Sequence, residues 1–255
     1  MKAVILAGGK GTRIAEESRI RPKPMVEIGG VPILWHIMKI YEKYGVNEFV
    51  ICCGYKGHVI KDYFINYIRY SDNICVDLEN ANTSSLSGHS EKWKVTLVDT
   101  GYDTLTAGRI KQIKRYVDGE QFFLTYGDGV SDINLDNLLA FHNKKKKAVT
   151  ISLTKPTARF GGAVIDTSDN RILGFREKSK EDQSWVNMGF MVMEPTFFEY
   201  LGDGSEMLER GPFERLVAEG QMNGYCHNGF WSPMDNIHDR DYLEELWASG
   251  DAPWK

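Results

Sequence analysis

The sequence predicts an α/β fold, with a mixed but mainly parallel sheet flanked by helices and a small β insertion. The apolar run Val4–Leu6 is followed by a glycine-containing loop and then by residues 32–41, whose apolar positions recur with helical spacing. A second apolar run, 49–53, precedes another helical pattern at 59–68. Continuous apolar runs are typical of strands buried on both faces. The order strand, helix, strand, helix therefore favours a doubly wound parallel sheet.

The later elements continue this alternation. Strands are predicted at 95–99, 122–126, 148–153, 171–176 and 189–193, and helices at 108–116, 213–219 and 242–247. The polar, Ser- and Asn-rich stretch 79–90 is predicted to be an exposed loop, and the basic run 144–147 a solvated helix end. Because no internal repeat or linker is evident, residues 1–255 are interpreted as one domain.

Composition excludes several classes of partner. Hydrophobic residues make up 42% and charged residues 26% of the 255 positions, the balance of an ordinary globular protein. The apolar runs are too short to span a membrane, so no membrane partner is expected. A formal net charge of −4 gives no overall basic field, so no nucleic-acid partner is expected either. An anionic ligand must therefore be held by local groups.

The cysteines predict a reducing compartment. Cys52, Cys53, Cys75 and Cys226 show no C-x-x-C spacing, which argues against a zinc site and against a disulfide framework. We expect four reduced, buried thiols. The initial run Met1–Leu6 is too short for a secretion signal, so the expected location is cytoplasmic.

The loop after the first predicted strand carries the first functional signal. Gly8, Gly9 and Gly11 allow backbone N–H groups to converge on an anion, and Lys10 and Arg13 add positive charge. The loop lacks the Gly-Lys-Ser/Thr of a Walker motif and the third glycine of a dinucleotide fingerprint. A phosphate-binding loop of another type is indicated, although an ordinary tight turn would look similar in isolation.

A second basic segment follows at Arg21–Met25. Its Lys23 stands between Pro22 and Pro24, which restrict the backbone and exclude a helix interior. An exposed proline-rich turn is the simpler interpretation. Because the segment follows the glycine loop so closely, we interpret the two together as a pair of phosphate clamps.

These segments together resemble the signature of the sugar-1-phosphate nucleotidylyltransferases, in particular the branch that transfers a cytidylyl group. The signature is Leu6–Arg13 followed by Arg21–Met25. Further similar blocks lie at 33–38, 51–57, 98–101, 125–130, 159–161, 229–231 and 252–255. The resemblance implies a Rossmann-like fold of the nucleotide-diphospho-sugar transferase type. It also implies Mg²⁺-dependent, in-line transfer from CTP to α-D-glucose 1-phosphate, giving CDP-glucose and pyrophosphate for surface polysaccharide synthesis.

The resemblance also assigns roles to residues on the nucleotide side. The residues that would cradle the nucleotide are Leu6, Ala7, Gly8, Gly9, Lys10, Gly11, Thr12 and Arg13. Arg13 would neutralise the leaving pyrophosphate, and Lys23 would bridge the α-phosphate and the sugar phosphate. Thr104 and Arg109 match a nucleotide-recognition segment, although a helix N-cap and a surface arginine are the simpler alternative.

The remaining assignments concern the metal and the sugar. Asp128, in a Gly-Asp-Gly turn after a predicted strand, and Asp235 would both be Mg²⁺ ligands, with Asp128 also contacting substrate. A lone aspartate in such a turn is often only a turn former. Glu177, Lys178 and Asn187 match sugar-binding positions. Departures from the family pattern around these three leave the identity of the sugar open.

Three alternatives remain at this stage. The same chemistry with another sugar 1-phosphate, or with dTTP or UTP, is the nearest. A nucleotide-sugar sensor without turnover is the second, and the lysine and the two aspartates argue against it. A metal-dependent glycosyltransferase is the third, and we would expect it to carry an Asp-x-Asp pair. Assembly into a homo-oligomer is expected from the resemblance alone.

Overall fold

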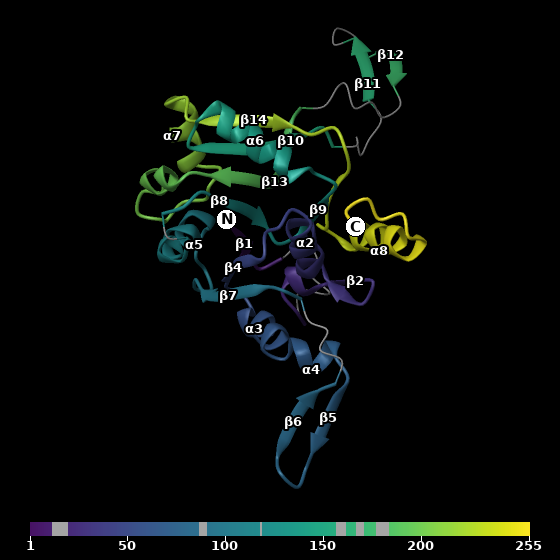
Figure 1. The fold of residues 1–255 in the computed structure, drawn as a ribbon. Coiled ribbons are helices and arrows are strands. Elements are labelled where there is room, and N and C mark those ends of the chain that lie inside the picture. Colours follow the sequence, from purple (N-terminus) through teal and green to yellow (C-terminus); the bar gives the residue numbers. More distant parts are fainter. Residues whose placement is uncertain (12–19, 87–90, 118, 157–161, 167–170, 177–183) are drawn as a thin grey trace.

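A computed structural model of the chain describes residues 1–11, 20–86, 91–117, 119–156, 162–166, 171–176 and 184–255. Its centre is a seven-stranded sheet (Figure 1). The strands, in their order across the sheet, are β14 (Met222–Cys226), β10 (Val149–Thr154), β13 (Val186–Met193), β8 (Phe122–Tyr126), β1 (Lys2–Ala7), β4 (Glu48–Cys53) and β7 (Lys94–Asp99). Only β13 runs antiparallel to its neighbours. The predicted mixed, mainly parallel sheet is confirmed.

Helices cover both faces of this sheet. The helices are α2 (Ile33–Glu42), α3 (Gly57–Ile65), α4 (Tyr67–Ser71), α5 (Thr106–Gln112), α6 (Leu135–Lys145), α7 (Pro212–Ala218) and α8 (Ile237–Ser249). Short 3₁₀ turns lie at Lys23–Met25, Lys114–Tyr116 and Pro195–Tyr200. The two faces can be followed along β1, because alternate residues point in opposite directions.

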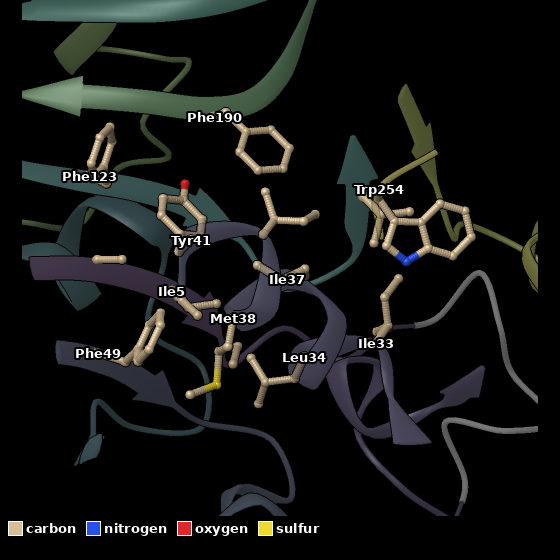
Figure 2. Close-up of a cluster of buried hydrophobic side chains, with 14 of the residues drawn as sticks. Ile5, Ile33, Leu34, Ile37, Met38, Tyr41, Phe49, Phe123, Phe190 and Trp254 are labelled. Atoms are coloured by element: carbon tan, nitrogen blue, oxygen red, sulfur yellow. The ribbon is translucent and has the colours of Figure 1, made fainter. Parts of the chain in front are cut away.

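Ile5 on β1 belongs to one buried cluster and its neighbour Val4 to another. The first cluster is centred on α2, whose Leu34, Ile37 and Tyr41 are completely buried (Figure 2). The second contains buried residues of α5 and α7. Complete burial of one such side chain stabilises the fold by roughly 1.5–3 kcal/mol, which explains why β1 reads as a continuous apolar run.

The described part of the chain also contains four smaller two-stranded sheets. They are β2 (Glu27–Ile28) with β3 (Val31–Pro32), β5 (Ile74–Asp77) with β6 (Asn82–Ser85), β9 (Gly129–Ser131) with β15 (Trp231–Pro233), and β11 (Gly162–Asp166) with β12 (Arg171–Arg176). The pair β11–β12 is an antiparallel insertion outside the main sheet. A small β insertion was predicted, and β12 has the predicted bounds.

The stretch predicted as the loop 79–90 is different in the structure. Residues 82–85 form β6, which pairs with β5 in a hairpin that projects from the body of the molecule (Figure 1). The prediction was wrong because both strands of this hairpin are exposed along their whole length. β6, with the sequence Asn-Thr-Ser-Ser, contains no apolar residue, so no alternation marks it as a strand.

Two helix predictions also need correction. The single helix predicted at 59–68 is divided at Asn66 into α3 and α4. The side-chain amide of Asn66 donates to the carbonyl of Asp62 at this break. The helix predicted at 242–247 is α8, which begins at Ile237. Its start is fixed by a capping box between Asn236 and Asp239, and these bonds satisfy backbone N–H groups of the first turn.

The cysteines are free thiols, as expected, but only two of them are buried. Burial raises the pKa of Cys52 to about 12 and that of Cys53 to about 11, so both are protonated at neutral pH. Cys75 lies on the projecting hairpin and Cys226 on the edge strand β14, and both are exposed. The prediction of four buried thiols was therefore wrong for the two cysteines outside the sheet interior.

Among the described residues, no helix combines the length and hydropathy that a bilayer crossing requires.

Candidate active site

A cavity of about 350 Å³ lies where the parallel strands β1 and β8 end. The carboxyl ends of parallel strands are the usual position of ligand sites in open α/β sheets. The described residues that line it are Leu6, Ala7, Gly8, Gly9, Gly11, Lys23, Pro24, Thr104, Leu105, Thr106, Arg109, Tyr126, Gly127, Asp128, Met207 and Asp235. Most of the nucleotide-side residues predicted from the sequence therefore border one space.

Lys23 joins two carboxylates at this cavity. Its Nζ lies 2.7 Å from Oδ2 of Asp128 and 2.8 Å from Oδ1 of Asp235. The lysine side chain is 10% exposed, and its backbone is held between two buried prolines in the turn that precedes β2. Burial alone would lower the pKa of Lys23, but the charges and hydrogen bonds of the two carboxylates raise it. The ammonium is therefore fully charged at neutral pH.

The pair β9–β15 brings the two aspartates together. Asp128 follows β8 in the turn that leads to β9, and Asp235 follows β15 just before α8. In the antiparallel register Gly129 faces Pro233, and the backbone N–H of Met234 donates to the carbonyl of Asp128 at 2.8 Å. Two residues far apart in the sequence thus present their side chains to the same point.

The donor set of Asp128 and Asp235 fits a hard divalent cation. Their oxygens already converge on one positive charge, the Lys23 ammonium, at hydrogen-bond distance. The described residues contain no group of three or more metal-ligating side chains. Mg²⁺ is commonly held by one or two carboxylates together with waters and substrate phosphates. This pair fits such a site, in which nucleotide phosphates would complete the coordination.

The glycine loop lies beside this centre. Gly8 is buried and its carbonyl accepts from the N–H of Tyr55, whereas Gly9 and Lys10 are exposed. Gly11 has φ +60°, a conformation that favours glycine. Lys10 pairs with Asp103 at 2.6 Å, and this hydrogen bond and charge raise the pKa of Lys10. Thr12 and Arg13, predicted to belong to the same loop, lie outside the described residues.

Arg109 is a buried residue, which excludes the alternative of a surface arginine. Its side chain lies under the glycine loop, and the residue is 4% exposed. Nη2 donates to the carbonyl of Gly8 at 3.0 Å, and Nη1 donates to Thr100 Oγ1 at 2.7 Å and to the carbonyl of Gly101 at 2.8 Å. Gly8 and Gly54 leave the space that the guanidinium fills, because a Cβ at either position would lie within 2.4 Å of Nη1.

The other predicted residues are more scattered. Thr104 borders the cavity but does not cap the neighbouring helix, which begins at Thr106 after Leu105. Asn187, on β13, accepts a hydrogen bond from the N–H of Gly189 and is not among the described lining residues. Glu177 and Lys178 lie outside the described residues.

Tyr126 and Met207 are lining residues that sequence reasoning missed. Tyr126 is the last residue of β8, two positions before Asp128, and its hydroxyl donates to the carboxylate of Glu209. This proximity to the aspartate was a usable signal. Gly189, with φ +89°, lies so close to the Tyr126 ring that a Cβ there would be 2.8 Å from Cδ2.

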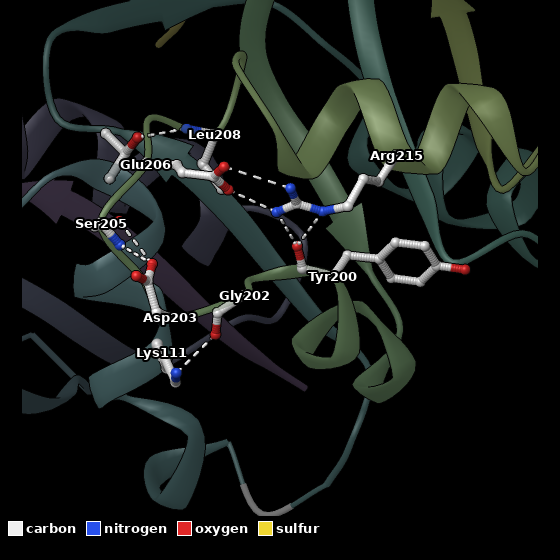
Figure 3. A network of polar contacts seen from close by, with 9 residues as sticks. Lys111, Tyr200, Gly202, Asp203, Ser205, Glu206, Leu208 and Arg215 are labelled. Atoms are coloured by element: carbon white, nitrogen blue, oxygen red, sulfur yellow. Dashed lines mark hydrogen bonds and ion pairs between the residues drawn. The ribbon is translucent and has the colours of Figure 1, made fainter.

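Met207 belongs to the segment 200–211, which no periodic pattern marks. Side chains of neighbouring helices fasten this segment (Figure 3). Arg215 Nη2 donates to Glu206 at 2.6 Å and to the carbonyl of Tyr200 at 2.7 Å. Lys111 Nζ donates to the carbonyl of Gly202 at 2.7 Å. The position of Met207 therefore depends on contacts between α5, α7 and this segment, which the sequence does not reveal.

A family model described as "Nucleotidyl transferase" matches residues 2–237. The chain belongs to the nucleotidyl transferase family. This nucleotidyl transferase is 45% identical over 256 residues to the glucose-1-phosphate cytidylyltransferase of Salmonella typhi, covering 100% of the chain and 99% of that protein. It is 44% identical, with the same coverage, to the probable glucose-1-phosphate cytidylyltransferase of Bacillus subtilis. The resemblance seen in the sequence is confirmed.

Solved structures give the same fold at low sequence identity. The nucleotidyl transferase superposes on UDP-glucose pyrophosphorylase complexed with UDP-glucose with a TM-score of 0.70 and 17% identity, covering 98% of each chain. HddC from Yersinia pseudotuberculosis complexed with GMP-PN gives a TM-score of 0.67 at 22% identity, with 96% and 99% coverage. At these identities the structures bear on the fold alone, and they confirm the Rossmann-like assignment.

Proposed function

We propose that this nucleotidyl transferase moves a cytidylyl group from CTP to α-D-glucose 1-phosphate, releasing pyrophosphate and forming CDP-glucose. The observation that carries the proposal is the convergence of Lys23, Asp128 and Asp235 at the cavity beside the glycine loop. The choice of CTP and glucose 1-phosphate is supported by the names of two relatives that match the whole chain at 44–45% identity.

This reaction needs positioning and charge neutralisation more than proton transfer. A phosphate monoester has a second pKa near ~6, so the sugar phosphate is largely a dianion at neutral pH and needs no general base. Its oxygen forms a bond to the α-phosphorus while the bond from that phosphorus to the bridging oxygen of pyrophosphate breaks. The main obstacle is the repulsion between two anions, which cations placed at the developing charge relieve.

The cavity offers a place for each part of this reaction. The loop residues Gly8, Gly9 and Gly11, together with Thr104 and Arg109, border the side of the cavity that would take the nucleotide. Asp128 and Asp235 would hold Mg²⁺, which supplies charge neutralisation at the phosphates when bound. Lys23 would then turn from the carboxylates to the α-phosphate and the sugar phosphate. The assignments of Arg13 to pyrophosphate and of Glu177, Lys178 and Asn187 to the sugar rest on the sequence resemblance.

We also propose that the chain works in the cytoplasm as a homo-oligomer. The hairpin β5–β6 carries exposed Ile74, Val76 and Leu78, the last 88% exposed, on an extension of the molecule. A second copy of the chain would cover this apolar surface. Light scattering of the purified protein tests assembly, and a monomeric mass would contradict it. Leu78→Ser should lower the mass measured by light scattering if the hairpin forms the contact between copies. Leu105→Ser, at an exposed leucine outside the hairpin, should leave that mass unchanged.

The deciding experiment is pyrophosphate release with Mg²⁺, glucose 1-phosphate and each of CTP, UTP, dTTP, ATP and GTP in parallel. We expect release with CTP, and CDP-glucose identified by mass. Release with UTP or dTTP instead would change the nucleotide but retain the chemistry. No release with any nucleotide would require a panel of other sugar 1-phosphates, and failure of that panel would favour a non-catalytic sensor.

A further inference from the structure

A polar cluster lies at the end of the β9–β15 ribbon opposite the two proposed metal ligands. Asp128 is anchored to the main sheet, because the N–H of the preceding Gly127 donates to the carbonyl of Leu6 at 3.0 Å. Asp235 follows β15, which pairs with β9 outside the main sheet, so Asp235 reaches Asp128 through the ribbon. The ribbon pairs only three residues with three, from Trp231–Ser131 to Pro233–Gly129. A two-stranded ribbon of this length is marginally stable by itself.

The far end of the ribbon is closed by Asp132 and His227. The Nε2 atom of His227 lies 2.8 Å from Oδ1 of Asp132 and 3.3 Å from the carbonyl of Phe230. Both partners are acceptors, so this nitrogen carries the proton. The same Oδ1 accepts from the N–H of Phe230 at 2.7 Å, and the N–H of Asp132 donates to the carbonyl of Phe230 at 3.3 Å. One carboxylate thus joins both strands of the ribbon.

This cluster is also tied to the main sheet. The N–H of His227 donates to the carbonyl of Leu153 on β10 at 2.8 Å, directly after the last paired residue of β14. The imidazole is mostly buried, with 11% of its side chain exposed. Gly229 lies against the carboxylate, since a Cβ there would be 2.4 Å from Oδ1 of Asp132. A side chain at position 229 would therefore displace the carboxylate of Asp132 or the ring of His227.

Ser131 does not turn the cluster into a nucleophilic triad. Its Oγ lies 3.5 Å from the same Nε2 that contacts Asp132, whereas a triad uses the two different ring nitrogens. Ser131 is completely buried and donates to the carbonyl of Phe230 at 2.7 Å. The serine therefore adds another hydrogen bond across the ribbon and is not arranged as a nucleophile.

We propose that Asp132 and His227 are positioning residues for the reaction: their contact closes the ribbon and so sets the separation of Asp128 from Asp235. The inference rests on the metal site of the proposed function. Loss of the contact leaves both aspartates in the protein but lets Asp235 move relative to Asp128. Removal of a group bonded directly to a metal ligand typically costs 10–100-fold in metal affinity, and Asp132 and His227 act one step further out, through the ribbon, so we expect a loss at the lower end of that range. The cost should fall on metal affinity more than on turnover at saturating metal.

The test compares Asp132→Ala with Asp132→Asn, which retains an acceptor oxygen, and with Asp136→Ala, which removes an exposed carboxylate on α6. Mn²⁺ binding in the presence of CTP is measured by electron paramagnetic resonance, and the Mg²⁺ dependence of pyrophosphate release is measured separately. We expect Asp132→Ala to weaken Mn²⁺ binding and to raise the half-saturating Mg²⁺ about tenfold, with kcat at saturating Mg²⁺ within about threefold. Asp132→Asn should restore most of the affinity, and Asp136→Ala should match the wild type.

A metal affinity of Asp132→Ala within twofold of the wild type would overturn the proposal, even if the melting temperature falls. If Asp132→Ala does not fold, His227→Ala and His227→Gln are measured in the same way. His227→Ala leaves the bond from Phe230 to Asp132, and the glutamine supplies a new N–H donor. Failure of the metal site itself has a different signature, because Asp128→Asn would then bind Mn²⁺ as tightly as the wild type.

Discussion

The indole Nε1 of Trp254 donates a hydrogen bond to Nδ1 of His36, at 3.3 Å. Nε2 of the same imidazole lies 2.9 Å from the carbonyl of Ile28, to which it donates. One ring nitrogen accepts and the other donates, so the pair fixes a neutral tautomer of a histidine that is 1% exposed. A second proton on the ring would sit on Nδ1 and point at the indole N–H of Trp254, so the charged form of His36 is disfavoured. The residues after α8 are thereby attached to α2.

This relationship predicts a loss of stability in mild acid. Burial lowers the pKa of His36 below 6.5 in the folded protein. The unfolded chain then binds the proton more readily, so the free energy of unfolding falls as pH drops from 6.5 towards the folded-state pKa. Titration of the His36 ring by NMR should give a midpoint below 6.5. Trp254→Phe should move it upward more than Trp247→Phe does, and a midpoint above 6.5 would contradict the prediction.

Substitution of Gly8 should damage the nucleotide loop, whereas substitution of Gly9 should not. A Cβ at Gly8 would lie 2.2 Å from Nη1 of Arg109, and this guanidinium is held by carbonyls on several sides. No described atom lies within 4 Å of a Cβ at Gly9. Overpacking typically costs about 1–3 kcal/mol, so Gly8→Ala should raise the KM for CTP roughly tenfold. Equal KM values for the two variants would show that the loop adapts.

Removal of the Arg109 donors should destabilise the fold. Arg109→Met leaves the carbonyl of Gly101 without this donor, while the carbonyl of Gly8 keeps only its bond from Tyr55 and the hydroxyl of Thr100 only its bond to Cys53. Each unsatisfied buried group costs about 1–3 kcal/mol, and we expect a total near ~3 kcal/mol in urea unfolding. The control is Lys111→Met. Lys111 lies on the same helix as Arg109 but makes an exposed hydrogen bond, to the carbonyl of Gly202, so its loss should cost less than about 1 kcal/mol. A similar loss of unfolding free energy in Arg109→Met and Lys111→Met would show that the buried hydrogen bonds of Arg109 do not stabilise the fold.

Asp128→Asn should abolish turnover without unfolding the protein. The variant removes one proposed metal ligand, while Lys23 retains its contact with Asp235. Loss of several kcal/mol of charge stabilisation corresponds to about 10³-fold in kcat. Pyrophosphate release measures the first effect and the melting temperature the second, with Asp136→Asn as the control. Near-normal activity with Mg²⁺ would remove Asp128 from the metal site.

The sequence predicted the parts of the site that local chemistry marks. Two prolines around Lys23 restrict its backbone whatever the rest of the chain does, and glycines mark the loop at Gly8. The meeting of Lys23 with Asp235 is different, because these residues are 212 positions apart and only the folded ribbon joins them. Asp235 was identified through resemblance to a family, since no local pattern distinguishes it.

Burial of polar groups was the second limit of sequence reasoning. Arg109 lies on a short helix between Gly108 and Ile110, and nothing in that pattern indicates that its guanidinium reaches under the loop at Gly8. The hairpin β5–β6 was missed for the opposite reason, because its strands bury nothing. The burial of Arg109 and the exposure of the hairpin both depend on which parts of the folded chain pack together, and no local sequence pattern reports this.

The distribution of the site along the chain has a consequence for protein synthesis. Lys23 and Asp128 leave the ribosome well before Asp235, and the strand that carries Asp235 to its partner is also made late. A nascent chain can form much of the central sheet without yet having the second carboxylate. Products of premature termination before residue 235 should therefore be inert as nucleotidyl transferases, however well their sheet folds.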